Sequence, residues 1–377
     1  MSWRILYGFG GCGNFGDDYM LDRWISYYGD NRADLSLCVV RPDRWLESFY
    51  SASSNFSLET GFHEIFRRAV ETLRGVTEDH IEHNILAGKK AALDILSSEE
   101  HRGRLLELEA IQFFGGGYWN KRYAEPWGMA ALLSEISFAL NVPLIATGVG
   151  VTPVLQKNRQ SVDEIISRFD LIEVRDIESY EEFSRKYPCS NIVFGSDDTF
   201  ITPVRVEGSP ENTETSINIC VQSNLAGDES HDRILNRILK FIDGYEGTFD
   251  IKYLQFHDGP DQVFFKKLEA ALGIDIRVYT KTDMLRNGLP IKKNDVCIST
   301  RFHLHLLAAR VGAKGAYVAT GDDYYSVKHK SVCDLGSDWL DLLNSTQCLE
   351  DMLKANFDSI DEKRERAMKL SRLSGYI

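Results

Sequence analysis

A strand-to-helix junction in the second half of the chain carries the side chains best suited to chemistry. An apolar stretch, 295–299, runs directly into Thr300-Arg301-Phe302-His303 and then into an apolar helical segment. If Thr300 caps that helix, Arg301 and His303 fall in its first turn, where the positive end of the helix dipole attracts an anion. His303 adds a side chain that exchanges a proton near neutral pH. The segment predicts an anion site with an acid/base beside it, unless both residues merely flank an ordinary helix.

Two other cations lie near predicted strand ends and could contact an anionic ligand. Arg175 ends a strand and precedes Asp176, which is well placed to cap the next helix. Lys328 belongs to a basic segment, 324–330, which follows another predicted strand. Each has a plainer interpretation, since Arg175 could form a surface ion pair with Asp176 and Lys328 could lie in a solvated loop. His257 also stands at a strand end, and we interpret this single histidine as structural.

A glycine turn after the first strand has the form of a dinucleotide-binding fingerprint without its usual surroundings. Residues 11–16 read Gly-Cys-Gly-Asn-Phe-Gly and fit G-x-G-x-x-G. Asp17 and Asp18 would place negative charge beside a pyrophosphate, and Arg41 stands where NAD requires an acidic ribose ligand. NADP binding through Arg41 stays an alternative. We favour a flexible turn with Asn14 and Asp17 as ligand contacts, or a tight turn in which Asp17 caps the helix.

Two more glycine loops follow predicted strands. Gly115-Gly116-Gly117 precedes Tyr118, and three adjacent glycines cost enough conformational entropy to indicate a need for space. The other loop, 147–153, reads Thr-Gly-Val-Gly-Val-Thr-Pro. Because parallel strands end at one edge of a sheet, the loops together predict a ligand site there, with Gly116, Gly117 and Tyr118 as contacts. The aromatic residues that follow could stack on a sugar or pack in the core: Tyr118, Trp119, Tyr123 and Trp127. For Trp127 we favour packing in the core.

Apolar segments alternate between strand and helix patterns along most of the chain. Such alternation predicts parallel sheets with helices on both faces. The predicted strands include 3–7, 34–40, 110–114, 143–147, 217–222 and 249–256, and the predicted helices include 17–28, 127–140, 262–272 and 301–311.

A polar segment broken by Gly and Pro, 203–216, is the best linker in the sequence. We therefore predict an α/β protein of two Rossmann-like domains, GT-B-like, with parallel sheets and an interdomain cleft that binds the ligand. The domains are 1–202 and 217–345. A C-terminal helix within 346–377 could pack back on the N-terminal domain.

Composition limits the classes of function. The chain has 377 residues and a formal net charge of −13, which argues against nucleic-acid binding because that needs a basic surface. The seven cysteines are scattered, so neither a disulfide framework nor a zinc site is indicated, and no other metal-ligand cluster stands out. We find no signal peptide and no apolar run of membrane-spanning length. These features predict a cytoplasmic protein, with peripheral attachment to the inner face of a membrane left open.

Taken in order, the motifs resemble those of the polysaccharide pyruvyl transferase family. They span roughly residues 8 to 335, and the ordered set is more specific than any single motif. Little resemblance is visible in 45–108 or at the C-terminus. The matching segments are Gly10-Gly11-Cys12-Gly13-Asn14-Phe15-Gly16-Asp17, Gly115-Gly116-Gly117, Gly148-Val149-Gly150 with Pro153, Val174-Arg175-Asp176, Asp197-Asp198-Thr199-Phe200 and Arg301-Phe302-His303.

The resemblance implies a GT-B-like fold and transfer of the pyruvyl group of phosphoenolpyruvate onto two hydroxyls of a sugar, with release of phosphate. It implies that Arg301 and Arg175 bind the donor's carboxylate and phosphate, that His303 is the acid/base, and that Lys328 adds an anion contact. Arginine suits both anionic groups because its planar fork binds them in a bidentate manner. No metal or cofactor is expected, since arginines can neutralise the leaving phosphate. His305 is extra to the motif, so it stays open which histidine works.

The resemblance also places the acceptor on the N-terminal domain and the donor on the C-terminal domain. The acceptor is expected to be a lipid-linked or nucleotide-linked sugar in the assembly of a cell-surface polysaccharide. Two other functions stay open. A GT-B glycosyltransferase would use a nucleotide sugar and would need contacts for a nucleobase and a ribose. A non-catalytic glycan-binding member would tolerate the loss of both Arg301 and His303.

Overall fold

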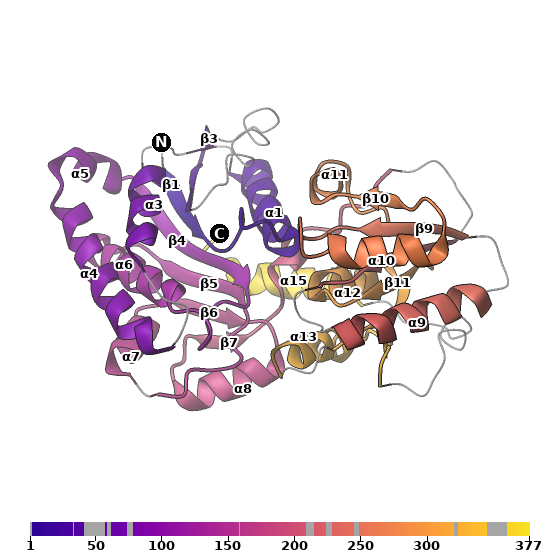
Figure 1. The fold of residues 1–377 in the computed structure, drawn as a ribbon. Helices are drawn as coiled ribbons and strands as arrows, with labels where there is room; N and C mark the ends of the chain where they lie inside the picture. Colours follow the sequence, from indigo (N-terminus) through magenta and orange to yellow (C-terminus); the bar gives the residue numbers. More distant parts are fainter. Residues whose placement is uncertain are drawn as a thin grey trace. The chain divides into compact units, whose positions relative to one another are not determined.

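Two compact units, each with its own parallel sheet, make up the chain in a computed structural model (Figure 1). Unit 1 comprises Met1–Cys12, Asp17–Thr202 and Glu365–Ile377, and unit 2 comprises Gly13–Gly16 and Pro203–Arg364. Gly13–Gly16 of the first glycine turn thus belong to unit 2, and the C-terminal residues belong to unit 1. The structure describes residues 2–32, 34–40, 57–58, 62–73, 78–157, 159–208, 215–223, 228–244, 249–319, 323–344 and 360–377.

Unit 1 contains a seven-stranded sheet in the order β3-β2-β1-β4-β5-β6-β7. Neighbouring strands are parallel throughout. Strands β1 and β5 are buried along their whole length, as expected for a parallel sheet covered on both faces. The strands are β1 (Trp3–Tyr7), β2 (Ser36–Val40), β3 (Ser57–Leu58), β4 (Leu108–Gly116), β5 (Leu144–Val149), β6 (Leu171–Val174) and β7 (Ile192–Phe194).

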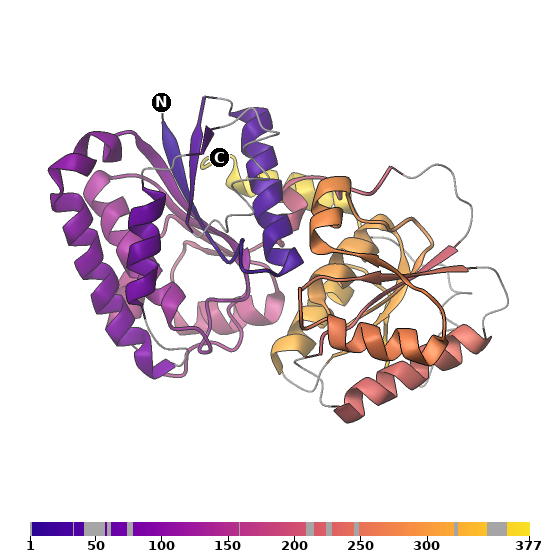
Figure 2. The ribbon, with the colours of Figure 1, turned by 45° about the horizontal axis from the view of Figure 1, so that its top comes forward.

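Helices cover both faces of this sheet (Figure 2). One core contains apolar side chains of α3 (His63–Thr72), α4 (Ile81–Ser97), α5 (Glu99–Leu105), α6 (Glu125–Leu140), α7 (Gln160–Ser167) and α8 (Ile177–Lys186). The other contains those of α1 (Phe15–Asn31) and α15 (Glu362–Leu373). The described part of the unit also contains the short 3-10 turns η1 (Glu78–His80) and η2 (Asp198–Ile201). Glycines let α4 and α6 meet closely, since a Cβ at Gly88 would stand 2.1 Å from the Gly128 carbonyl oxygen.

Unit 2 contains a six-stranded parallel sheet in the order β10-β9-β8-β11-β12-β13. Its core joins apolar strand residues to α9 and α10. The strands are β8 (Thr215–Cys220), β9 (Phe249–Leu254), β10 (Arg277–Tyr279), β11 (Val296–Ser299), β12 (Lys314–Tyr317) and β13 (Leu340–Asp341). The helices are α9 (Asp228–Gly244), α10 (Gln262–Leu272), α11 (Lys281–Asn287), α12 (Phe302–Val311) and α13 (Asp323–Asp334).

Part of the predicted linker, 203–216, is paired within unit 2. Val206 forms an isolated parallel bridge with Leu289, which ties the start of the segment to the unit. Strand β8 begins at Thr215, earlier than the predicted start of the second domain. Residues 209–214 lie outside the described residues.

The C-terminal segment contains α15, which begins in unit 2 and runs into unit 1. Residues 345–359 lie outside the described part of the chain, and so does Arg41, on which the NADP alternative depends. Among the helices that the structure describes, none combines the length and apolar character needed to cross a membrane.

Candidate active site

The start of α12 lies at the carboxyl edge of the unit 2 sheet, directly after β11. Arg301 occupies the N-cap position, so the prediction of a Thr300 cap is wrong. The Arg301 amide donates to the Ser299 hydroxyl at 2.8 Å. The Thr300 hydroxyl is used elsewhere, because it accepts from the Gln222 amide at 2.8 Å, just beyond β8. The start of the helix is therefore tied to two neighbouring strands.

Arg301 is held at this edge by a buried carboxylate. Its Nη2 forms an ion pair with Asp261 Oδ1, and the Asp261 side chain is fully buried. Asp261 Oδ2 also accepts from the amides of Phe256 and His257, at 3.0 and 2.9 Å. Burial raises the pKa of Asp261, and the Arg301 charge opposes that rise. Arg301 Nε is buried without a hydrogen-bond partner among the described residues, and an anionic ligand would satisfy such a donor.

The first glycine turn completes this edge, since Gly13–Gly16 packs within unit 2. The Phe15 amide donates to the Phe256 carbonyl at 2.8 Å, and the two rings lie 4.3 Å apart. Asn14 forms an isolated antiparallel bridge with His257. A segment from the beginning of the chain is therefore built into the same edge as Arg301.

The ring of His303 rests against Gly16. A Cβ at Gly16 would stand 1.8 Å from His303 Nδ1, so a larger residue would displace the ring. The Gly16 amide donates to Asn14 Oδ1 at 3.2 Å. Asn14, predicted as a substrate contact, thus uses its side-chain oxygen to shape the turn that seats His303.

His305, the alternative acid/base, belongs to a buried chain of hydrogen bonds. Its Nδ1 lies 3.1 Å from His329 Nδ1, and its Nε2 lies 2.9 Å from the Ser337 hydroxyl. His329 Nε2 lies 3.4 Å from the Thr300 carbonyl oxygen. Because a carbonyl only accepts, His329 carries its proton on Nε2, so His305 donates from Nδ1 and accepts from Ser337 at Nε2. Both nitrogens of His305 are therefore engaged.

The imidazoles of His305 and His329 are both neutral. Burial lowers the pKa of His305 well below its ordinary value, and the neighbouring His329 adds to that effect. Burial lowers the pKa of His329 to about 3. The rings stack with one another and with Tyr317, and Trp339 stacks on His305. His305 is thus engaged within the fold, and its partner His329 contacts the Thr300 carbonyl just before α12. This favours His303 as the residue that contacts a substrate.

Arg175 lies at the carboxyl edge of the unit 1 sheet, after β6. Its Nη1 donates to Asp197 Oδ2 at 2.7 Å, and each side chain is only 3% exposed. Asp176 caps α8, as predicted, by accepting from the Ser179 amide at 2.7 Å. Gly150 flanks the guanidinium, since a Cβ there would stand 3.3 Å from Arg175 Nε. Arg175 is therefore part of a buried ion pair beside a glycine loop.

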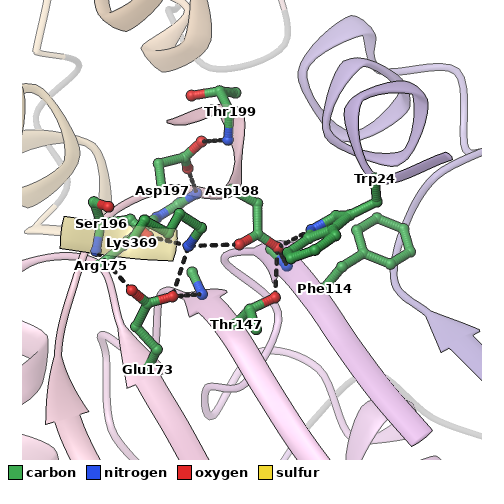
Figure 3. Close-up of polar contacts among 12 residues, drawn as sticks. Trp24, Phe114, Thr147, Glu173, Arg175, Ser196, Asp197, Asp198, Thr199 and Lys369 are labelled. Atoms are coloured by element: carbon green, nitrogen blue, oxygen red, sulfur yellow. Dashed lines mark hydrogen bonds and ion pairs between the residues drawn. The ribbon is translucent and has the colours of Figure 1, made fainter. Parts of the chain in front are cut away.

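A buried cluster of charges lies close to this edge (Figure 3). Lys369 of α15 contacts Glu173 Oε2 at 2.6 Å and Asp198 Oδ1 at 2.8 Å, and all three side chains are fully buried. Burial alone would lower the pKa of Lys369, but the two carboxylates raise it overall. Asp198 Oδ2 also accepts, at 2.7 to 2.8 Å, from Trp24 Nε1, the Gly115 amide and Thr147 Oγ1. Asp198 therefore fixes two of the glycine-loop strands and binds α15 to the sheet.

The triple-glycine loop is shaped by its own neighbour, Tyr118. Gly116 has a φ of 96°, and a Cβ there would stand 2.6 Å from the Tyr118 ring and 3.5 Å from Asp17 Oδ1. The Tyr118 side chain is buried, and its hydroxyl donates to the Phe114 carbonyl at 2.6 Å. Tyr118 thus supports the turn around Gly116 and Gly117, and its role as a substrate contact stays a prediction.

The remaining predicted residues have varied surroundings. Trp127 is buried in the core, which confirms the interpretation favoured for it. Trp119 is buried beside it with ring centroids 5.5 Å apart, so stacking on a sugar is wrong for Trp119. Tyr123 packs edge-on against Phe9. Lys328 lies on α13 rather than in a loop.

The structure brings Arg301, His303 and Asn14 together in unit 2, whereas Arg175, Asp17 and the other glycine loops belong to unit 1. Sequence reasoning missed the buried partners of these residues, which are Asp261, Asp198, Glu173, Lys369, His329 and Ser337. The turn around Asp261 carries no signal that it meets Arg301, and only the match of Asp198 to a family motif could have marked one of them. Among the described residues, no group of three His, Cys, Asp or Glu side chains could hold a metal ion.

Solved structures of the same architecture define the fold class. The UDP-GlcNAc 2-epimerase from Neisseria meningitidis, bound to UDP-GlcNAc, has 11% identity and a TM-score of 0.55, with 100% of each chain covered. A putative UDP-N-acetylglucosamine 2-epimerase from Listeria monocytogenes has 12% identity and a TM-score of 0.54, with 99% of this chain and 96% of that chain covered. These likenesses confirm a GT-B-like fold of two parallel-sheet α/β domains, and the ligand cleft between them stays a prediction.

No curated protein sequence matches the chain. The sequence model of the polysaccharide pyruvyl transferase family matches residues 14–322, most of the chain. The protein therefore belongs to the polysaccharide pyruvyl transferase family, which confirms the resemblance seen in the motifs.

Proposed function

We propose that the protein is a ketal pyruvyltransferase, which moves the pyruvyl group of phosphoenolpyruvate onto a sugar of a cell-surface polysaccharide precursor. The observation that carries the proposal is the arrangement at the start of α12. Asp261 fixes the Arg301 guanidinium at the helix N-terminus, and His303 follows against Gly16. Such a site combines attraction for an anion with a group for proton transfer, and phosphoenolpyruvate needs both. Membership of the family supports the same activity.

The proposed reaction adds two sugar hydroxyls to C2 of phosphoenolpyruvate. C3 receives a proton, the first hydroxyl oxygen bonds to C2 and loses its proton, and the C2–O bond to phosphate then breaks. The second hydroxyl oxygen bonds to C2, and its proton is transferred to the departing phosphate. The products are a cyclic ketal and inorganic phosphate, so one proton ends on carbon and one on phosphate.

We assign Arg301 to the anionic groups of the donor, because a guanidinium binds carboxylate and phosphate in a bidentate manner. His303 is assigned to proton transfer. Arg175 and Lys328 are proposed as further anion contacts that neutralise the leaving phosphate, and the proposal includes no cofactor. We place the acceptor, a lipid-linked or nucleotide-linked sugar, against the glycine loops, with Asn14, Asp17, Gly116 and Gly117 as contacts. Such an acceptor would place the reaction in the cytoplasm, at the inner face of a membrane.

Thermal unfolding with phosphoenolpyruvate, nucleotide sugars and free glycans tests the proposal. A ligand at about a hundred times its Kd should stabilise the protein by roughly 2.7 kcal/mol, enough to shift Tm. We expect a shift with phosphoenolpyruvate that is much smaller in Arg301→Ala. Arg301→Lys, which keeps the positive charge beside Asp261 but loses the planar fork, should show a reduced shift. A shift with nucleotide sugars alone would favour a GT-B glycosyltransferase, and a shift with glycans alone would favour a non-catalytic glycan-binding member.

A further inference from the structure

We propose that His257 is a second acid/base residue of this site and takes the proton from the attacking sugar hydroxyl. The inference rests on the proposed function, because addition of a hydroxyl to phosphoenolpyruvate requires two proton transfers, one to C3 and one from oxygen. A protonated His303 supplies the proton to C3. A neutral base is then needed for the hydroxyl, and His257 lies at the same edge of the same sheet.

A single carboxylate connects His257 to Arg301. Asp261 Oδ1 pairs with Arg301 Nη2, while Asp261 Oδ2 accepts from the His257 amide at 2.9 Å. His257 follows β9 and Arg301 follows β11, with β8 between them in the sheet. Since neighbouring strands lie about 4.8 Å apart, the two strand ends are roughly 10 Å apart, a span that suits a ligand the size of phosphoenolpyruvate. Asp261 thus fixes the backbone of His257 with respect to the cation that would bind the donor.

The first glycine turn connects His257 to His303. A Cβ at Gly13 would stand 3.8 Å from His257 Nε2, and a Cβ at Gly16 would stand 1.8 Å from His303 Nδ1. Asn14, between the two glycines, forms the bridge with His257. The two imidazoles therefore border the same short segment of one unit.

The hydrogen bond of His257 favours the tautomer with the proton on Nδ1, which a general base acting through Nε2 requires. Its Nδ1 lies 2.8 Å from the Asp258 carbonyl oxygen, which only accepts, so the proton is on Nδ1. Nε2 then carries a lone pair that can take a proton. The His257 side chain is partly exposed, whereas those of His231, His305 and His329 are buried.

His305, His329, His231 and Asp261 are engaged within the fold. His305 and His329 are buried and bonded to one another. His231 is buried, with Nε2 3.4 Å from the carbonyl oxygen of Gln222. Asp261 is engaged by Arg301 and by two backbone amides.

Histidine NMR with phosphoenolpyruvate as the probe tests the inference without an acceptor. The ring signals of His257 and His303 would be assigned from the variants His257→Asn and His303→Asn. Asn at position 257 can still donate to the Asp258 carbonyl, so the local backbone should be preserved. We expect saturating phosphoenolpyruvate to raise the pKa of His257 by about one unit or more, since an opposite charge within about 4–6 Å favours the charged imidazolium.

The outcomes separate this inference from the proposed function. If phosphoenolpyruvate moves the signals of both rings and raises the pKa of His257, the inference stands. If it moves His303 alone, the proposed function stands and the role of His257 is overturned. If it moves neither ring, the proposed function fails and the inference fails with it.

Kinetics give a second readout that a purely structural role would not move. With p-nitrophenyl glycosides as acceptor probes, His257→Asn should lower kcat by about 10²–10⁴-fold and leave KM for phosphoenolpyruvate within about two-fold. The fall in activity at low pH, where the base becomes protonated, should disappear, while the fall at high pH remains. His83→Asn, which removes an exposed histidine on α4, is the control. A raised KM with an unchanged pH profile would overturn the assignment.

Discussion

Each unit places an arginine at a strand end and pairs it with a buried aspartate, but the surroundings of the two pairs differ. In unit 1 the Arg175–Asp197 pair lies near a second buried cluster of charges. In unit 2 the Arg301–Asp261 pair lies beside the histidines that the glycine turn borders. An arginine–aspartate pair is thus a way to build a sheet edge, and the neighbouring proton-transfer groups make one edge a candidate for chemistry.

The buried networks behind the two edges also differ in charge. In unit 1, Lys369 lies between Glu173 and Asp198, so the network is ionic and its members depend on one another. In unit 2, His305 and His329 are neutral and form a chain of ordinary hydrogen bonds. The contribution of the first network to the stability of the fold should be most sensitive to the loss of a charge, and that of the second to protonation of its histidines.

Removing the acid/base of unit 2 should have the largest effect. His303→Asn should lower turnover by about 10³-fold, or roughly 4 kcal/mol, because it removes proton transfer and leaves Arg301 in place. The measurement is phosphate release from phosphoenolpyruvate with a panel of glycoside acceptors, with His83→Asn as the control. Unchanged turnover would end the assigned role of His303.

Removing the buried cation of unit 1 should destabilise the fold. Lys369→Met removes the buried cation that Glu173 and Asp198 share, and leaves Glu173 the ion pair with Arg372 at 3.5 Å. It should cost about 3–5 kcal/mol in the free energy of unfolding. Lys363→Met, at an exposed position of the same helix, should change it by less than about 0.5 kcal/mol. Urea denaturation followed by tryptophan fluorescence compares the two. Equal losses would mean that the buried cluster contributes no more than the helix surface.

Enlarging Gly16 should disturb His303 while the fold is kept. Gly16→Ala places a methyl group in the volume of the His303 ring and should lower turnover by about 10²-fold, since a misplacement of about 1 Å can cost that much. Gly29→Ala, in the same helix but with open space around it, is the control. Affinity for phosphoenolpyruvate should be nearly unchanged. An equal loss of turnover in both variants would mean that the effect comes from the change within the helix and not from displacement of the His303 ring.

Acidification should produce the smallest effect, acting through the neutral histidines of unit 2. The pKa values of His305 and His329 are below the ordinary value in the folded protein, so the unfolded chain binds more protons below about pH 6.5. Stability should therefore fall as the pH drops, by about 1 kcal/mol per ring between about pH 7 and 5.5. Urea midpoints at the two pH values measure the loss. Nitrogen NMR showing either ring protonated near pH 5 would contradict the account.

Local patterns were enough to predict much of the fold. The strand at 3–7 and the helix at 262–272 have the predicted bounds, because each is a short apolar or amphipathic pattern that its own residues determine. The helix predicted from Trp127 begins at Glu125, since Pro126 is suited to a first turn. The ordered glycine loops and the Arg301 segment likewise indicated the family.

The parts of the site that were not predicted depend on contacts between distant segments. Lys369 meets Glu173 across 196 positions, and His305 meets His329 across 24, and no local pattern encodes such meetings. The prediction that Thr300 caps α12 was wrong for the same reason, because the amide of Gln222, just beyond β8, donates to the Thr300 hydroxyl. Tertiary partners override local preference wherever the side chain can reach either.

Calorimetric titration of phosphoenolpyruvate into the protein, Arg301→Ala and His303→Asn tests the central claim most directly. We predict saturable binding to the unaltered protein, similar affinity in His303→Asn, and a Kd weakened by about 10- to 100-fold in Arg301→Ala, since hydrogen bonds to charged groups contribute about 1.5–3 kcal/mol. Absence of binding to the unaltered protein, or equal binding by Arg301→Ala, would contradict the placement of the donor at the start of α12.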